Sequence, residues 1–162
     1  MEELYRAYLT FLRSMTKGLE CLTDLNEKKF DAARVDDLMA LNELLNQEQA
    51  QSLHFRGLEQ TRDKLLPKLG LEGVPLSRVA GKFPPALQEE ARKAAACLQD
   101  QYAAYQAASK KTRTLLERNL QEVETAIVEM GGPPAGGENG PGYRRETETA
   151  APPPSMKTDF RA

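Results

Sequence analysis

The stretch PALQEEARKAAACLQDQYAAYQAASKKTRTLLERNLQEVETAIVEM, residues 85–130, decides the fold. Its larger apolar residues recur three or four positions apart, which is the period of an α-helix with one apolar side. Pro85 is a favoured first residue of a helix, and the glycines and prolines of 131–134 end one. At about 1.5 Å per residue this helix is roughly 65 to 70 Å long, so it buries its narrow stripe only against other long helices.

Two more helical patterns precede this stretch. Residues 2–33 carry the stripe Leu4, Tyr8, Phe11, Met15, Leu19, Leu22 and Leu25. Residues 36–69 carry Leu38, Leu41, Leu45, Leu58, Leu65 and Leu69. Because the reversal between the two patterns is short, the two helices should lie antiparallel. The predicted fold class is therefore all-α: an elongated antiparallel three-helix bundle with coiled-coil-like packing.

Local signals predict where the second helix begins and ends. Asp36 is the expected N-cap, because its carboxylate can accept from the first free amides of a helix. Gly70 is the expected C-terminal cap. Pro67 lacks an N–H group, so it should kink the helix or end it near Leu66.

Composition divides the rest of the chain. The middle of the second helix, residues 47–52, is poor in apolar groups, so its packing should be looser or more polar. Residues 70–84 form a connector in which residues 76–80 are expected to make one or two helical turns. Residues 131–162 contain 6 Gly and 6 Pro in 32 positions and few apolar groups, which predicts a disordered tail behind a helical body of residues 1–130.

Charge and hydropathy exclude several classes of partner. With 22 basic and 24 acidic residues, the formal charge is −2, and no clustered excess of Lys and Arg is available to hold nucleic acid. The longest run of apolar residues is Ala94 to Leu98, and the start Met1-Glu2-Glu3 lacks the basic region of a signal peptide. Cys21 and Cys97 match no metal-binding spacing and are expected to be free thiols in a reducing compartment. We expect a cytoplasmic protein that does not insert into membranes.

Residues capable of catalysis are sparse. His54 is the only imidazole, and local spacing places no carboxylate or nucleophile beside it. The glycines of 131–142 contain no GK[ST] motif and follow no strand, so they do not predict a phosphate-binding loop. We therefore expect no enzymatic activity, no metal and no cofactor.

A binding surface is the remaining possibility. The adjacent pairs Leu115–Leu116 and Ile127–Val128 make the apolar face at the end of the long helix wider than one partner helix needs. A wide face of this kind is typical of a site for an amphipathic helix of another chain. Tyr143 is an isolated aromatic residue in the tail, so it is either a docking anchor or incidental.

The order of several weak motifs resembles the flagellar export chaperones of the FlgN type over the whole chain. The matching parts are Leu38-x-x-Leu41, Leu58-Glu59-x-x-Arg62-x-x-Leu65-Leu66-x-x-Leu69-Gly70, Leu76-Ser77-Arg78-Val79-Ala80, Thr114-Leu115-Leu116-Glu117-Arg118-Asn119, and Tyr143 in the tail.

The resemblance implies a cytosolic chaperone that binds the C-terminal helices of hook-associated (hook–filament junction) proteins. Such a chaperone prevents their premature assembly and delivers them to the type III flagellar export gate. By position, the cargo-binding residues would be Leu115, Leu116, Asn119, Leu120, Val123, Ile127 and Met130. Tyr143 would contact the export-gate membrane protein. The alternative is a structural coiled-coil adaptor with no export role, whose stripes bind one another or a second copy.

Overall fold

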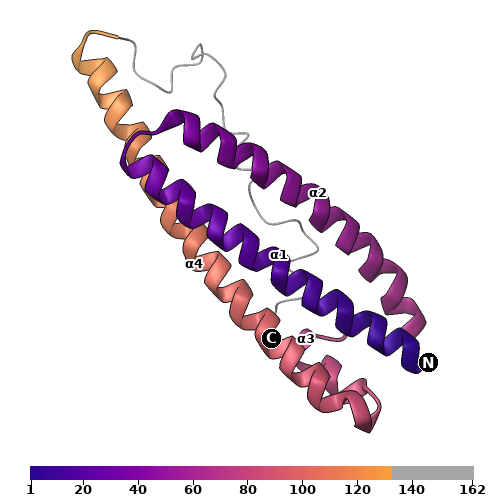
Figure 1. The fold of residues 1–162 in the computed structure, drawn as a ribbon. Helices are drawn as coiled ribbons and strands as arrows, with labels where there is room; N and C mark the ends of the chain where they lie inside the picture. The colour runs from indigo at the N-terminus through magenta and orange to yellow at the C-terminus, as the bar shows by residue number, and fades with distance from the viewer. Residues whose placement is uncertain (133–162) are drawn as a thin grey trace.

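The structure, a computed structural model, describes residues 1–132. Figure 1 shows three long helices and a short helical connector. In chain order the elements are α1 (Glu2–Arg34), α2 (Leu38–Leu69), α3 (Leu76–Val79), the 3₁₀ turn η1 (Ala80–Lys82) and α4 (Pro85–Glu129). The all-α class, the three long helices and the helical turns of the connector are confirmed. The predicted disordered tail lies, from Pro133 onward, outside the described residues.

Helix α1 is the central element of the bundle. It packs against both α2 and α4, whereas the backbones of α2 and α4 hardly approach each other (Figure 1). The contacts that fix the helix directions are Lys29–Glu48 and Gly18–Phe55 between α1 and α2, and Gln101–Thr23 and Asn119–Ala33 between α1 and α4. Helix α2 therefore runs antiparallel to α1, and α4 runs parallel to it.

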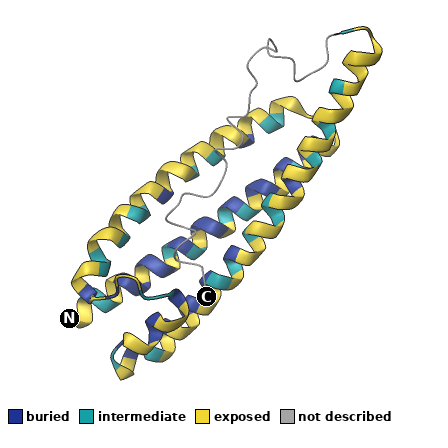
Figure 2. Ribbon diagram, turned by 180° about the vertical axis from the view of Figure 1, so that it is seen from behind, coloured by how far each residue is buried: buried dark blue, intermediate teal, exposed yellow. Residues whose placement is uncertain are grey.

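The core follows from this central position. Figure 2 shows buried residues along the whole of α1 and few along α2. Leu12 and Leu19 of α1 are almost completely buried, and only Leu44, Phe55 and Leu69 are buried on α2. At one crossing a Cβ added to Gly18 would come within 2.8 Å of Cζ of Phe55, so the absence of a side chain there lets the aromatic ring pack directly on α1.

The connector closes the end of the bundle at which α1 begins. Leu71, Val79 and Phe83 are each at most 2% exposed. The ring of Phe83 lies 4.8 Å from that of Tyr5 and 6.1 Å from that of Tyr8, measured between centroids, which is the range of favourable aromatic pairs. We call this end, from residue 71 to residue 83 with the start of α1, the closed end.

A polar layer crosses the bundle about two to three helical turns from the α1–α2 turn. The Lys29 ammonium lies 2.8 Å from a carboxylate oxygen of Glu48, and the Thr112 hydroxyl donates to the Asn26 carbonyl at 2.9 Å. Burial, and after it the charge of Glu48, raise the pKa of the Tyr105 hydroxyl. The more polar packing expected for the middle of the second helix is confirmed, and this layer joins all three long helices.

One prediction about helix ends is wrong, and of the two alternatives predicted for Pro67 the early helix end is excluded. Asp37, not Asp36, caps α2, since its carboxylate accepts from the Ala40 amide at 3.1 Å. Asp36 instead adopts the left-handed conformation (φ 54°) at the end of α1, where the Asp37 amide donates to the Ala32 carbonyl. Pro67 does not end α2 near Leu66.

Helix α2 continues for three residues beyond Leu66 because Leu69 is buried and because Gly70, with φ 64°, completes a proper helix end. The Leu71 amide donates to the Leu66 carbonyl at 3.0 Å, as in a Schellman motif. A proline in the last turn removes one intrahelical hydrogen bond, and the packing of the turn compensates for it.

Candidate partner-binding surface

The apolar side of α4 extends beyond the helix that covers it. Ala91, Leu98 and Tyr102 are buried on the side of α4 that packs in the core. Near the end of α1, Nδ2 of Asn119 donates to the Ala33 carbonyl at 3.1 Å, one residue before α1 ends. Residues 120–130 then project past the α1–α2 turn (Figure 1). We call them the α4 overhang, which is about 15 Å long at 1.5 Å per residue.

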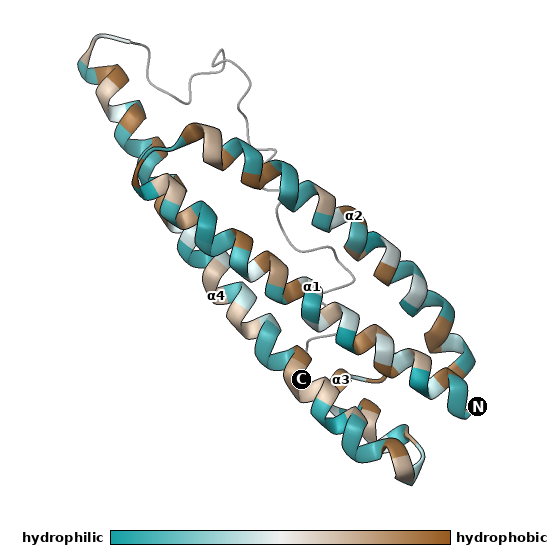
Figure 3. Cartoon of the chain, in the orientation of Figure 1, coloured by the Kyte–Doolittle hydropathy of each residue, from teal (hydrophilic) through white to brown (hydrophobic). Residues whose placement is uncertain are grey.

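Apolar side chains on the overhang keep the spacing of the buried seam. Leu116, Leu120, Val123, Ile127 and Met130 follow one another at intervals of three and four residues, and we call them the overhang stripe. Leu116 is 37% exposed, while Leu120 and Val123 are 58% and 55% exposed. Figure 3 shows apolar residues continuing to the far end of α4. Exposed apolar side chains that adjoin one another make this stripe a candidate interaction site.

The structure divides the predicted cargo-binding residues into two groups. Four of them lie on the overhang: Leu120, Val123, Ile127 and Met130. Leu116 lies one helical turn before the overhang begins. Leu115 is half-buried. Asn119 is half-buried as well, and its amide is bonded to the end of α1. Tyr143 lies outside the described residues.

The turn between α1 and α2 contributes exposed apolar residues that sequence reasoning missed. Val35, Leu38 and Met39 are all more than 70% exposed and lie at the same end of the molecule as Asn119 and the overhang. The sequence placed Leu38 on the buried stripe of the second helix, and that prediction is wrong. Leu38 is the first residue of α2, and the first buried residue of this helix is Leu44.

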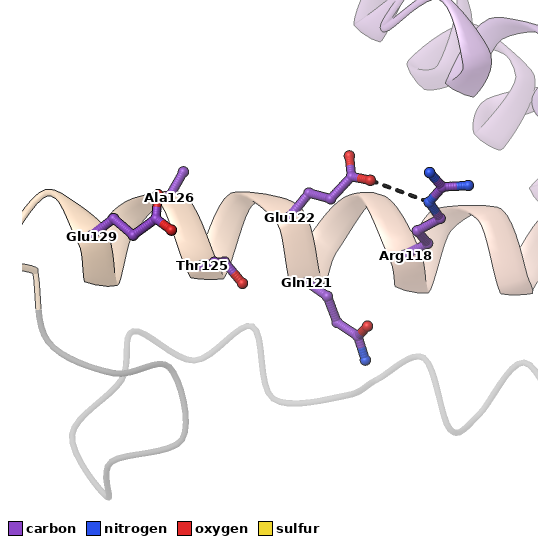
Figure 4. A pocket seen from close by; sticks show the side chains of 6 residues that line it. All are labelled: Arg118, Gln121, Glu122, Thr125, Ala126 and Glu129. Carbon is purple, nitrogen blue, oxygen red and sulfur yellow. Dashed lines mark hydrogen bonds and ion pairs between the residues drawn. The ribbon is translucent and has the colours of Figure 1, made fainter.

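The opposite side of the overhang is polar. Figure 4 shows the group of side chains on that side: Arg118, Gln121, Glu122, Thr125, Ala126 and Glu129. Within it the Arg118 guanidinium lies 3.2 Å from the carboxylate of Glu122, four residues on, which is an ordinary surface ion pair. The overhang therefore has one apolar and one polar side, as expected of a helix that binds along a single face.

Other groups with chemical potential lie apart from one another. His54 is exposed on α2 beside the ring of Phe55, and the free thiols are Cys21, half-buried on α1, and Cys97, exposed on α4. Within residues 1–132, no three His, Cys, Asp or Glu side chains come together in a way that could hold a metal ion. None of the helices in this range is both long and apolar enough to cross a membrane.

No protein-family model, no curated protein and no solved structure matches this chain.

Proposed function

We propose that this chain holds an amphipathic helix of another protein on the overhang stripe, as a chaperone that keeps the helix soluble. One observation carries the proposal: the apolar seam that joins α4 to α1 continues for about 15 Å past the end of α1 with its side chains exposed. Exposed apolar surface of this kind is favourable to cover, at roughly 25 cal/mol for each Å² removed from water.

A helix is the partner that this stripe fits. Its side chains repeat at intervals of three and four residues. A second helix laid beside them would meet a row of ridges and grooves like the one on which α1 packs nearer the closed end. Recognition of an amphipathic helix in an apolar groove needs four or so anchors on one side and no catalytic group. The overhang supplies anchors of that number and spacing.

The resemblance to FlgN-type export chaperones names the class of partner. In that proposal the cargo is the C-terminal helix of a hook-associated flagellar protein, and the complex is delivered in the cytoplasm to the export gate. Terminal helices of proteins that assemble into filaments are amphipathic and associate with one another, so covering the apolar side would prevent premature assembly. Tyr143, in the tail, would be the residue that docks the chain on the export-gate membrane protein.

The cargo proposal is tested by charge substitutions on the two sides of the overhang. Leu120→Asp and Val123→Asp place a carboxylate on the stripe, and each should weaken binding of a purified hook-associated protein by at least roughly tenfold, measured by size-exclusion chromatography and calorimetry. Thr125→Asp adds the same charge on the polar side and should bind like the wild type. Equal binding by all three variants would remove the overhang stripe from the function.

The docking role of Tyr143 needs a separate measurement. Tyr143→Ala should leave cargo affinity unchanged and should abolish capture of the chain by the cytoplasmic part of the export-gate protein in a pull-down assay. Capture that persists at wild-type strength would assign gate docking to another part of the chain.

The alternative function, a coiled-coil adaptor, covers the same stripe with a second copy of this chain. Its signature is an obligate dimer, which sedimentation equilibrium detects directly, together with no affinity for flagellar cargo. A dimer that Leu120→Asp dissociates would favour the adaptor.

A further inference from the structure

The charges beside the overhang stripe indicate which helices it accepts. Glu117 and Glu124 are seven residues apart on α4, so both lie along one edge of the stripe. Neither has an ion-pair partner among residues 1–132, and Glu124 is half-buried. The overhang itself contains Glu122, Glu124 and Glu129 and no basic residue.

The bundle already shows how glutamates beside a seam are used. Glu90 of α4 is paired with Arg13 of α1 in the part of the α1–α4 contact that is nearer the closed end. Glu48 of α2 is paired with Lys29 of α1 across the other contact. In both cases α1 supplies the basic residue and its neighbour supplies the acid. Glu117, beside the last turn of α1, and Glu124, beyond it, have no basic partner within residues 1–132.

We infer that the overhang stripe selects an amphipathic helix with Lys or Arg at two positions seven residues apart along one edge, which takes the place of α1 above the α1–α2 turn. The inference rests on the proposed function and adds the charge of the partner to it. Residues beside the apolar seam of paired helices form ion pairs between the helices and so decide which partners associate. From Leu116 to Met130 the stripe spans about 21 Å, which matches a partner helix of roughly four turns.

Charge also separates this partner from a second copy of the chain. Two overhangs laid stripe to stripe in the antiparallel direction would bring the edges that carry the glutamates together, and in either direction neither overhang supplies a basic residue. Like charges facing one another across paired helices disfavour association. A basic helix meets the same edge with attraction, and this attraction weakens as salt screens it.

The test uses two synthetic 18-residue peptides with the same leucine face, one with lysines and one with glutamates along its edges. Fluorescence anisotropy with the full chain should show the lysine peptide binding roughly three- to tenfold more tightly, and the difference should shrink between low and high salt. Glu117→Lys with Glu124→Lys should reverse the preference. The matched control is Glu122→Lys with Glu129→Lys, which changes the charge equally and at the same spacing on the polar side, and it should keep the preference.

Each other outcome has a distinct meaning. If both peptides bind equally and Leu120→Asp still abolishes binding, the charge selection is wrong and the helix-holding function stands. If neither peptide nor any hook-associated protein binds, the proposed function fails. If sedimentation shows a wild-type dimer that Leu120→Asp dissociates, a second copy occupies the stripe and the inference is overturned.

Discussion

The two ends of this bundle treat apolar side chains in opposite ways. At the closed end, the connector folds back so that Leu71, Val79 and Phe83 are each at most 2% exposed. At the other end, α4 runs on past α1, and Leu120 and Val123 remain more than half exposed. Both ends have several large apolar side chains. The difference is whether a segment within residues 1–132 covers them.

The two ends therefore differ in how much their apolar side chains contribute to the stability of the fold. Burial at the closed end is complete within the described chain, so it contributes to the free energy of unfolding. The side chains of the overhang stripe are 37% to 87% exposed within the described chain, so they contribute less to the free energy of unfolding. A helical segment without tertiary packing is also the part of a helix that unfolds most readily.

The largest test of the comparison removes an aromatic ring from the closed end. Phe83→Ala deletes a side chain that contacts the rings of Tyr5 and Tyr8, so we expect a loss of about 3 to 5 kcal/mol in the free energy of unfolding. Val123→Ala is the control at the overhang, and its unfolding free energy should lie within about 0.5 kcal/mol of the wild type. Urea denaturation of the full chain measures both, and comparable losses would mean that the overhang is covered in solution.

A second test asks how far the tight packing extends from the closed end. Gly18→Ala forces a methyl group against the Phe55 ring, so we expect a net loss of about 1 to 2 kcal/mol in stability despite the better helix propensity of alanine. Gly57→Ala is the matched control in the same pair of helices, where no atom lies within 4 Å of the added carbon. That variant should be more stable by about 0.5 to 1 kcal/mol, measured by thermal unfolding. Two changes of the same sign would contradict the close approach of α1 and α2.

Most of the fold could be predicted from the sequence because long amphipathic helices leave few ways to bury a stripe. The bounds of α4, the Gly70 cap and the connector turns followed from Pro85, Gly70 and the apolar spacing. The misplaced features are local. Asp36 and Asp37 are both plausible caps by composition, and only the backbone path, with one of them in the left-handed conformation, decides between them.

The candidate site was harder to predict, because periodicity cannot tell a covered stripe from an open one. Leu98 and Leu120 belong to the same pattern, and their exposures differ because α1 ends beside Asn119. The structural role of Asn119, and the exposure of Leu38 at the start of α2, depend on where the helices end relative to one another. No spacing within a single helix contains that information.

The smallest effect is expected at the α1–α2 turn beside the overhang. Asp36 has φ 54°, a conformation that costs residues with a side chain more than it costs glycine. Asp36→Gly should therefore stabilise the chain, by about 0.5 kcal/mol. The gain is small because aspartate tolerates this region better than most residues, and because glycine increases the entropy of the unfolded chain. The neighbouring Asp37→Ala removes the cap of α2 and should cost about 1 kcal/mol. Opposite signs at adjacent aspartates, measured by urea denaturation, would locate the turn as the structure has it, whereas equal losses would restore Asp36 as the cap.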